Sequence, residues 1–441
     1  MKQRMNFLFT TWEGGGNVTP ALEAVRKLVA RGHHVRIMSE ECNRPESTAA
    51  GAAFRCWRRA PSRKDRSPET QTCRDWAAAT PQEGLLSVIR DTWCGPALAY
   101  AQDVIEELRR EPADLVVTCE ALFGVMAGCE SIRQGFATLC PNISLVPLPG
   151  VPPLGPGLAP ARNEQERGMH AEIARASMSM FDSGLPALNA ARASLGLAPL
   201  EHLVDQFRAA KIELLATSQA FDFPSTGLPA KVRYVGPQIG DPNWAHPWKS
   251  PWAKSDQSPL VTIGFSTTFQ NHAGVLQKVI DALAPLPARV LVTLGGSIKS
   301  EELRPSENCV LVESAPHSVV MRESAFVVTH GGHGTVIRAL ISRTPMLVIP
   351  HGRDQNDNAV RVTERGAGLS LMPDASVEAI RTAAERLLGE RSFRAAAGRL
   401  GDLVAAEAEN STIVQELEAA ASTRENGGTR HKLARRLEVV A

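Results

Sequence analysis

Apolar residues along this chain are grouped in short runs that alternate with longer stretches of helical spacing. The first half opens with a predicted strand at residues 6–11, a Gly-rich turn at 12–17, a helix at 20–31 and a second strand at 34–38. Further apolar runs of strand length follow at residues 115–118, 214–217 and 232–235. This alternation is typical of a parallel sheet that helices cover on both faces.

A second alternating series begins after a break in the pattern. Residues 241–258 are rich in Pro and Trp, so we interpret them as an interdomain linker whose tryptophans pack against one domain. Strands are then predicted at residues 260–265, 289–293, 310–312, 326–329 and 346–349, and helices at 376–388 and 392–421. The sequence therefore predicts two α/β domains, at residues 1–240 and 259–421, with the last helices crossing back to the first domain. The basic tail at 422–441 is interpreted as a frayed, flexible terminus, with a weak membrane-surface or partner helix as the alternative.

Composition narrows the possible partners and compartments. The 441 residues exceed one ordinary core, and 43% hydrophobic with 22% charged residues is typical of a soluble globular protein. The net charge of +1 gives no reason to expect nucleic acid as a partner. Eight cysteines without zinc-ligand spacing indicate reduced thiols. With no signal peptide and no apolar run of roughly 18 residues, we expect a cytoplasmic protein without stable membrane insertion, either a monomer or a homodimer.

The most informative segment is Thr329-His330-Gly331-Gly332-His333-Gly334-Thr335-Val336, a Gly-rich turn between a predicted strand and a predicted helix. Glycines let the backbone approach a ligand closely, and the free amides and dipole of the following helix attract an anion. A phosphate group is the commonest anion at such a turn. The alternative is a tight turn that binds no ligand.

Three segments in a fixed order carry a resemblance to a known family. They are Ala315-Pro316-His317, the turn from His330 to Thr335, and Pro350-His351-Gly352-Arg353-Asp354-Gln355 with Asn358-Ala359. On this signature nearly the whole chain resembles the family 1 glycosyltransferases of the GT-B fold, in particular bacterial enzymes that decorate macrolides, polyketides and glycopeptides. The resemblance implies an α/β fold of two facing Rossmann-like parallel-sheet domains with an interdomain cleft. It also implies transfer from a nucleotide diphosphate sugar with inversion at the anomeric carbon.

The resemblance assigns the donor-binding residues to the second domain. His330 would donate to a phosphate oxygen and offset the charge of the leaving diphosphate. The other expected phosphate contacts are the amides of Gly332, His333, Gly334 and Thr335, the Thr335 hydroxyl, and Ser266 and Thr267 in the loop after the strand at 260–265. The backbone around Ala315 and His317 would hold the edge of a pyrimidine base.

Asp354 and Gln355 would bind sugar hydroxyls, because they place an acceptor beside a mixed donor and acceptor, whereas in isolation they would be interpreted as a solvated loop pair. Asp354 and Asp357 also suggest Mg2+. However, the amides, the helix dipole and the imidazole already supply positive potential, so we expect no metal and no cofactor, only a UDP- or dTDP-sugar as co-substrate. Both nucleotides stay open because Ser314 and Arg338 stand where plant relatives carry a base-stacking Trp and a ribose-binding Glu.

The general base is missing from its expected place. Members of the family usually carry a His in a Gly-His-Val-Asn-Pro type motif after the first strand, whereas this chain has Gly16-Asn17-Val18-Thr19-Pro20. The amide of Asn17 cannot take a proton at neutral pH. The Asp that usually orients the His is also in doubt, since the matching strand runs into Cys119 and Glu120. Three explanations stay open: an acidic acceptor positioned by Asn17, a base supplied by Glu13 or Glu120, or slow or absent transfer.

The acceptor side is less clearly encoded. The apolar, Pro-rich loop at residues 145–157 would line or cover an acceptor cleft, and simple packing over the first domain is the alternative. Met169, Met178, Met180 and Phe181 follow on a helix and could face the same pocket, although a Met stripe more often belongs to the core. We predict an inverting glycosyltransferase that moves a hexose or deoxyhexose to a hydrophobic natural-product aglycone. The alternatives are a non-catalytic or weakly active donor-binding partner of another glycosyltransferase and a nucleotide-sugar 2-epimerase.

Overall fold

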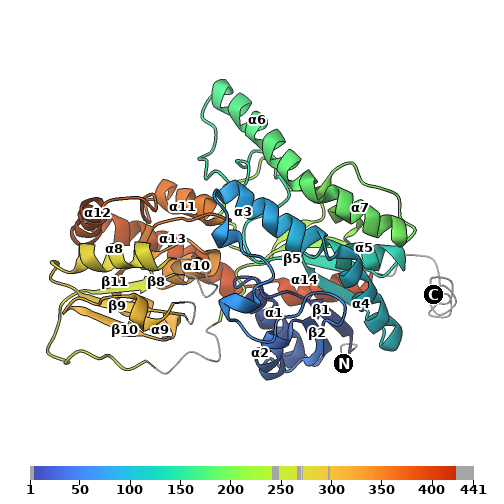
Figure 1. Cartoon of the computed structure of the whole chain (residues 1–441), viewed down its shortest axis with the longest axis horizontal. Coiled ribbons are helices and arrows are strands. Elements are labelled where there is room, and N and C mark those ends of the chain that lie inside the picture. The colour runs from blue at the N-terminus through green and yellow to red at the C-terminus, as the bar shows by residue number, and fades with distance from the viewer. Residues whose placement is uncertain (1–3, 241–247, 266–269, 271, 296–297, 424–441) are drawn as a thin grey trace.

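Two α/β lobes lie side by side in the computed structural model, each built around one parallel sheet (Figure 1). The structure describes residues 4–240, 248–265, 270, 272–295 and 298–423. Ser266 and Thr267, two of the predicted donor contacts, therefore lie outside the described residues. Among those described, no helix is long and apolar enough to cross a membrane.

The first sheet has seven strands in the order β3-β2-β1-β4-β5-β6-β7, with every neighbouring pair parallel. Its strands are β1 (Asn6–Thr10), β2 (His34–Ser39), β3 (Ala53–Cys56), β4 (Leu115–Cys119), β5 (Phe136–Cys140), β6 (Ile212–Leu215) and β7 (Val232–Tyr234). The helices of this half are α1 (Val18–Ala30), α2 (Arg44–Ala49), α3 (Pro81–Val88), α4 (Ala97–Arg110), α5 (Phe123–Ser131), α6 (Glu164–Phe181) and α7 (Leu185–Ser194). The order reverses between β1 and β4.

The second sheet has six parallel strands in the order β10-β9-β8-β11-β12-β13, which repeats the order of the first six strands of the other sheet. Its strands are β8 (Leu260–Gly264), β9 (Arg289–Thr293), β10 (Cys309–Val312), β11 (Ser324–Thr329), β12 (Met346–Val348) and β13 (Gly368–Ser370). The helices are α8 (Ala273–Leu283), α9 (His317–Glu323), α10 (His333–Ile341), α11 (Gln355–Glu364), α12 (Val377–Gly389), α13 (Arg391–Glu409) and α14 (Ile413–Ser422).

Short 3-10 or π turns complete the described elements, at Glu41–Asn43, Pro68–Thr70, Asp75–Ala77, Ile89–Cys94, Asp182–Gly184, Leu203–Ala209 and Ser300–Glu302. The predicted alternation of strands and helices is confirmed in both halves. The helix predicted at 392–421 is divided, because α13 ends at Glu409 and α14 starts at Ile413.

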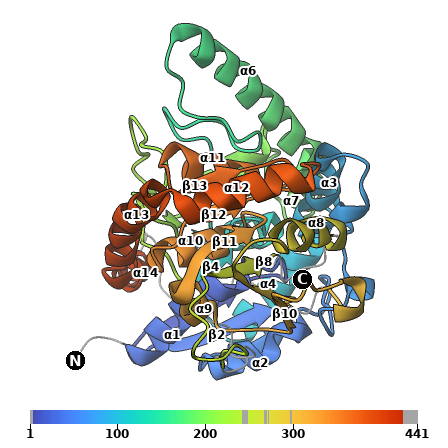
Figure 2. The same ribbon diagram turned by 90° about the vertical axis from the view of Figure 1, so that its left-hand side faces the viewer.

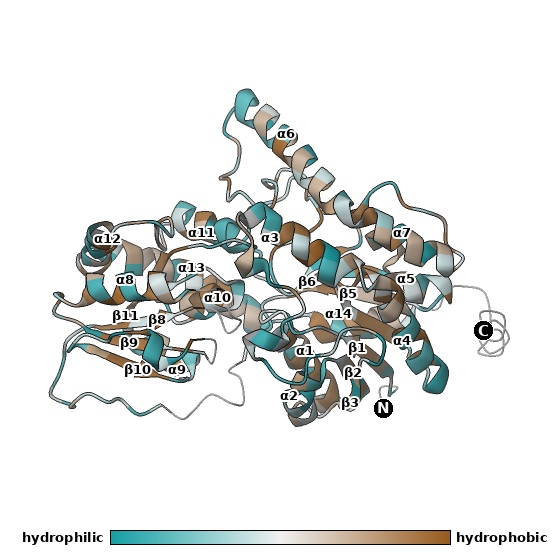
Figure 3. Ribbon diagram, viewed as in Figure 1, coloured by the Kyte–Doolittle hydropathy of each residue, from teal (hydrophilic) through white to brown (hydrophobic). Residues whose placement is uncertain are grey.

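The central strands are buried on both faces, as their continuous apolar sequence indicates. All five residues of β4 and all five of β8 are buried. Apolar residues therefore follow the strands, whereas the outer faces of the helices are polar (Figure 3). Ile413, Leu417 and Ala420 of α14 pack into the core of the first sheet beside α1, so the chain returns to its first lobe at the end.

The described part of the linker belongs to the second lobe. Trp248 and Trp252 pack against Leu260 and Leu291, in agreement with the interpretation that the linker tryptophans are held by one domain. The guanidinium of Arg289 also lies 5.7 Å from the Trp252 ring centroid. Trp244 lies outside the described residues.

Helix α6 extends away from the body of the molecule, as both ribbon views show (Figures 1 and 2). Phe181, at its last position, is its one buried residue among those described, and the Met169 side chain is 45% exposed. The interpretation of the whole Met stripe as core is therefore wrong. The N-terminal part of α6, which carries Met169, lies away from the body of the protein and does not pack into its core.

Candidate functional site

Glu120 and His330 follow equivalent strands of the two sheets. β4 neighbours the first strand of its sheet and β11 neighbours the first strand of the other. Each strand ends in a short loop before a helix, and Glu120 and His330 stand directly after their strands. Ligands of such sheets bind beyond the carboxyl ends of the strands, at the point where the strand order reverses. Both residues therefore lie where ligands of this type of sheet bind.

His330 is buried in an apolar and aromatic environment. Its side chain stacks on Phe265 with ring centroids 6.0 Å apart, and its residue exposure is 6%. Nδ1 has no hydrogen-bond partner among the described residues. A Cβ on Gly332 would lie 2.5 Å from His330 Nε2, so only glycine leaves room for the imidazole. Burial lowers the pKa of His330 to about 3, and the ring is therefore neutral at physiological pH.

Two further imidazoles, to which the sequence analysis assigned no role, lie beside His330. The ring centroids of His272 and His351 are 4.2 Å apart, and that of His272 is 5.8 Å from His330. His351 Nδ1 lies 2.8 Å from the carbonyl oxygen of Ile349, which assigns the proton to Nδ1. Nε2 of His272 and of His351 has no partner in the part of the chain that the structure describes. His351 belongs to the family signature, whereas no sequence signal pointed to His272.

The Gly-rich turn presents free amides at the start of α10. Gly331 adopts a φ of 93°, which glycine tolerates and other residues rarely adopt. Within the described ranges, the amides of Gly332, His333 and Gly334 donate no hydrogen bond. The Thr335 amide differs from the expectation, because it donates to the carbonyl oxygen of Gly332 over 3.0 Å. Of the four amides predicted to contact phosphate, three are therefore available.

The side chain of His333 faces the protein. Its Nδ1 lies 3.3 Å from Asn358 Oδ1, and the ring makes an edge contact with Phe221. Asn358 also donates from Nδ2 to the carbonyl oxygen of Gly331 and to Asp354 Oδ2, each over 2.9 Å. One asparagine on α11 thus ties the Gly-rich turn to the loop that carries Asp354.

Gln355 is not the solvated residue of the alternative interpretation. Its side chain is buried at 1% exposure, and its Oε1 accepts from the His351 amide over 2.7 Å. Its Nε2 donates to Gln270 Oε1 over 3.2 Å. Gln355 therefore shapes the loop in which His351 and Asp354 lie, in addition to any contact with a ligand.

Ala315 and His317 lie at the same edge of the second sheet. Ala315 is buried in the cluster that holds Trp248 and Trp252. His317 begins α9, and its Nε2 lies 3.2 Å from the hydroxyl of Thr293, the last residue of β9. The three signature segments therefore converge at the carboxyl ends of the strands.

On the first lobe, Asn17 stands immediately before α1. Together with Thr10, Thr11 and Cys119 it lines a small cavity at the end of the sheet. Its position beside Cys119 brings it close to the loop that carries Glu120.

Glu13 and Glu120, the two carboxylates considered as replacement bases, are in opposite situations. Glu13 is ion-paired with Arg66 over 3.0 Å and accepts from the Gly15 amide over 3.0 Å. Glu120 has no ion-pair partner as far as the described residues extend, and it is 8% exposed. Cys119 Sγ donates to its Oε2 over 3.3 Å. Burial, opposed by hydrogen bonds and assisted by the nearby Asp354 carboxylate, raises the pKa of Glu120 to about 7.

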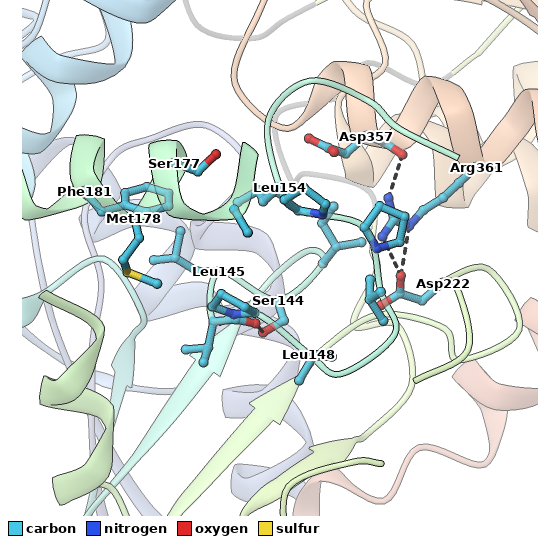
Figure 4. A pocket seen from close by; sticks show the side chains of 17 residues that line it. Ser144, Leu145, Leu148, Leu154, Ser177, Met178, Phe181, Asp222, Asp357 and Arg361 are labelled. Carbon is cyan, nitrogen blue, oxygen red and sulfur yellow. Dashed lines mark hydrogen bonds and ion pairs between the residues drawn. The ribbon is translucent and has the colours of Figure 1, made fainter. Parts of the chain in front are cut away.

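A pocket of about 520 Å³, including its open mouth, lies between the lobes beside this region. The loop at residues 143–154 forms much of its wall, so the Pro-rich segment lines a pocket as predicted. Met178 and Phe181 of α6 lie at one side, and a polar group lies at the other (Figure 4). The polar group consists of Asp222, Asp357 and Arg361.

Comparison with known proteins shows that the chain is similar to glycosyltransferases of natural-product pathways. Residues 277–420 match the C-terminal domain of erythromycin biosynthesis protein CIII-like proteins. Over 414 residues, the chain is 29% identical to 4'-demethylrebeccamycin synthase of Lentzea aerocolonigenes, covering 90% of this chain and 95% of that protein. The chain is a glycosyltransferase of the bacterial natural-product type.

Solved structures agree on the fold of this glycosyltransferase. The calicheamicin glycosyltransferase CalG4 superposes with a TM-score of 0.71 at 20% identity, over 95% of this chain and 98% of that one. The glycosyltransferase VinC, solved in complex with dTDP, superposes with a TM-score of 0.63 at 19% identity, over 95% and 100%. The predicted GT-B arrangement of two parallel-sheet domains is therefore confirmed.

Proposed function

We propose that this glycosyltransferase inverts the anomeric carbon as it transfers a hexose or deoxyhexose from a UDP- or dTDP-sugar to a hydrophobic natural-product acceptor. We further propose Glu120 as the general base. The observation that carries this proposal is the Glu120 carboxyl, which is buried near Asp354 of the second lobe and has no ion-pair partner among the residues that the structure describes. The other acidic candidate that the sequence suggested, Glu13, is ion-paired with Arg66.

The chemistry requires one displacement. The acceptor oxygen forms a bond to the anomeric carbon while the bond from that carbon to the diphosphate oxygen breaks, and the acceptor proton passes to Glu120. A base is most effective when its pKa lies near the working pH, and the pKa of Glu120 is about 7. A single in-line displacement inverts the configuration.

The leaving diphosphate would lie against the Gly-rich turn. The amides of Gly332, His333 and Gly334 can donate hydrogen bonds to it, and the positive end of the α10 dipole can stabilise its negative charge without a metal ion. His330 is neutral, so it would act as a hydrogen-bond donor. The dTDP bound in the VinC structure supports a pyrimidine diphosphate as the leaving group, and UDP remains equally open.

The acceptor would occupy the pocket between the loop at 143–154 and α6. Its wall is mostly aliphatic and aromatic, which suits a hydrophobic aglycone. Asp222 and Arg361 at one side would hydrogen-bond polar substituents.

A transfer assay tests the proposal. Wild-type protein is incubated with UDP- and dTDP-sugars and with hydrophobic acceptors of different acidity, products are detected by mass spectrometry, and their anomeric configuration is determined by NMR. We expect at least one product, with inverted configuration, and binding of UDP or dTDP by calorimetry. Nucleotide binding without any product would favour a donor-binding partner, and retained configuration would overturn the mechanism.

A further inference from the structure

Helix α11 contacts both halves of the proposed site through adjacent residues of its first turns. Asn358 reaches the Gly-rich turn and Asp354, as described above. Asp357, one residue earlier, reaches the other lobe, where its Oδ2 accepts from the Gly155 amide over 2.7 Å. The Gly157 backbone also acts on this carboxylate and lowers its pKa. One helix therefore holds the Gly-rich turn and the Pro-rich loop of the first lobe.

The Pro-rich loop is shaped to approach α11 closely. Gly155 and Gly157 have φ values of 120° and 72°, a region that glycine favours. A Cβ on Gly157 would lie 2.6 Å from the carbonyl oxygen of Asn356, so a side chain there would push the loop away. Asn356 Nδ2 adds a long contact of 3.4 Å to the Gly155 carbonyl oxygen. Both the glycines of the loop and the side chains of α11 therefore contribute to this contact.

The docked segment directly continues the wall of the acceptor pocket. Residues 151–154 line the pocket, and Asp357 itself lies at its polar side (Figure 4). Arg361, one turn later on α11, pairs with Asp222 over 2.7 Å, and both side chains are buried. The shape of the pocket therefore depends on where α11 sits.

We propose that Asp357 is a positioning residue that couples the acceptor pocket to the donor site, by docking the loop at 150–157 on the helix that begins beside Asp354. This inference rests on the proposed function, in which the sugar lies at Asp354 and Gln355 and the acceptor lies in the pocket. The ligand class that it concerns is the hydrophobic acceptor. The proposed phosphate contacts lie on the Gly-rich turn, to which Asn358 rather than Asp357 is hydrogen-bonded, so nucleotide binding should be insensitive to the loop.

The protonation of Asp357 should modulate this docking. Burial is the main cause that raises its pKa to about 6, and the Asp354 carboxylate acts in the same direction. The Gly155 and Gly157 amides and Arg361, itself paired with Asp222, act in the opposite direction. Below about pH 6 the carboxyl becomes neutral and accepts the two amides less strongly, so the loop should loosen as the pH falls.

The experiment compares wild type with D357A, D357N and E364A. Glu364 is a matched control, because it lies on the same helix and pairs with Arg162 of the following loop segment, but at the surface over 3.4 Å. Acceptor and donor KM are measured separately, nucleotide Kd by calorimetry, and amide exchange of the segment 150–157 by mass spectrometry. Hydrogen bonds to a carboxylate are each worth roughly tenfold in an equilibrium constant.

For D357A we expect about a tenfold or greater rise in acceptor KM, nucleotide Kd within about twofold of wild type, and faster exchange of the Gly155 and Gly157 amides. D357N keeps one acceptor oxygen and should lie between D357A and wild type. Its acceptor KM should be independent of pH between 5 and 7, whereas that of wild type rises below about pH 6. E364A should match wild type in every measurement.

Equal effects on acceptor KM and nucleotide Kd would overturn the proposal, as would unchanged loop exchange in D357A. If D357A fails to fold, the intermediate KM and the flat pH profile of D357N decide the question. Should wild type form no product at all, the proposed function fails, and amide exchange still tests the docking of the loop by Asp357.

Discussion

The carboxyl of Glu120 and the imidazole of His330 occupy equivalent places in the two lobes, and burial affects them in opposite ways. Both follow a central strand next to the reversal of strand order, and both lack an ion-pair partner among the described residues. Removal from water disfavours the charged form of each group. The pKa of Glu120 is thereby raised to about 7, and that of His330 is lowered to about 3.

As a consequence, the two lobes supply groups with different proposed roles. At neutral pH the carboxyl is available in its ionised form to take a proton, whereas the imidazole is neutral and can only share hydrogen bonds. The proposed reaction needs a base that takes the proton of the acceptor substrate. It also needs an uncharged hydrogen-bond donor to the leaving diphosphate. The same physical effect, applied to an acid and to a base, supplies both.

In the Gly-rich turn after β1, a side chain of the protein itself occupies the backbone amide. Its Gly15 amide donates to the Glu13 carboxylate, and Glu13 is held by Arg66. A turn whose amide already donates to a carboxylate of the chain has fewer free donors for a phosphate. The corresponding amides after β11 are free, which explains why only the second lobe should bind the diphosphate.

The largest expected effect comes from removing the carboxylate. Glu120→Gln keeps the size of the side chain but cannot take a proton, so kcat should fall by about a hundred- to ten-thousand-fold. In wild type the rate should rise with pH up to about 7, because the ionised form is the active one. This rise should be absent from the residual activity of the variant, as measured by pH-rate profiles.

Glu13→Gln is the matched control for that variant. It changes the other candidate base and breaks the contact with Arg66. We expect lower thermal stability with an unchanged pH profile. If the rise of the rate with pH is lost in Glu13→Gln and persists in Glu120→Gln, Glu13 rather than Glu120 is the general base.

The next effect tests the other side of the comparison. His330→Ala should lower kcat by about a hundred- to thousand-fold, the usual loss when one donor to a developing charge is removed. Nucleotide Kd from calorimetry should rise much less, because the charge on the diphosphate grows mainly in the transition state. His330→Asn keeps an N–H and should recover part of the loss. A fall in binding as large as the fall in kcat would contradict this role.

These residues also show what sequence can and cannot predict. β1, α1 and β2 end within about two residues of their predicted bounds, because periodicity and capping are local properties. The Gly-rich turn is equally local, since strand, glycines and helix are consecutive. The pKa of Glu120, in contrast, is raised mainly by burial and further by Asp354, which is 234 positions away along the chain and belongs to the other lobe.

The same limit explains the remaining differences. The burial of Gln355 and the docking of the Pro-rich loop by Asp357 arise from contacts between distant segments. The stripe of methionines was ambiguous because helical spacing does not reveal that α6 leaves the body of the protein. His272, which directly precedes α8, joins the imidazole cluster only through ring contacts with His330 after β11 and His351 after β12.

A smaller effect should appear when the neighbour of Glu120 is changed. Asp354→Asn removes a negative charge that raises the pKa of Glu120, so this pKa should fall. The rising limb of the pH-rate profile should then move to lower pH. Since Asp354 is also a proposed sugar contact, kcat itself is expected to fall, and the position of the limb is the informative quantity. If the limb stays in place or moves to higher pH, the Asp354 charge does not raise the pKa of the group that titrates, and this prediction is wrong.

The smallest expected change has the opposite sign. Cys119 donates a weak S–H hydrogen bond to Glu120 and so lowers the pKa of that carboxyl. Cys119→Ala should therefore move the limb slightly to higher pH, whereas Cys119→Ser, which keeps a donor, should leave it near the wild-type position or below. Because neither variant changes a group that contacts the proposed substrates, kcat on the plateau should be preserved. Opposite shifts from Asp354→Asn and Cys119→Ala would identify Glu120 as the group that titrates, since Asp354 raises the pKa of this carboxyl and Cys119 lowers it.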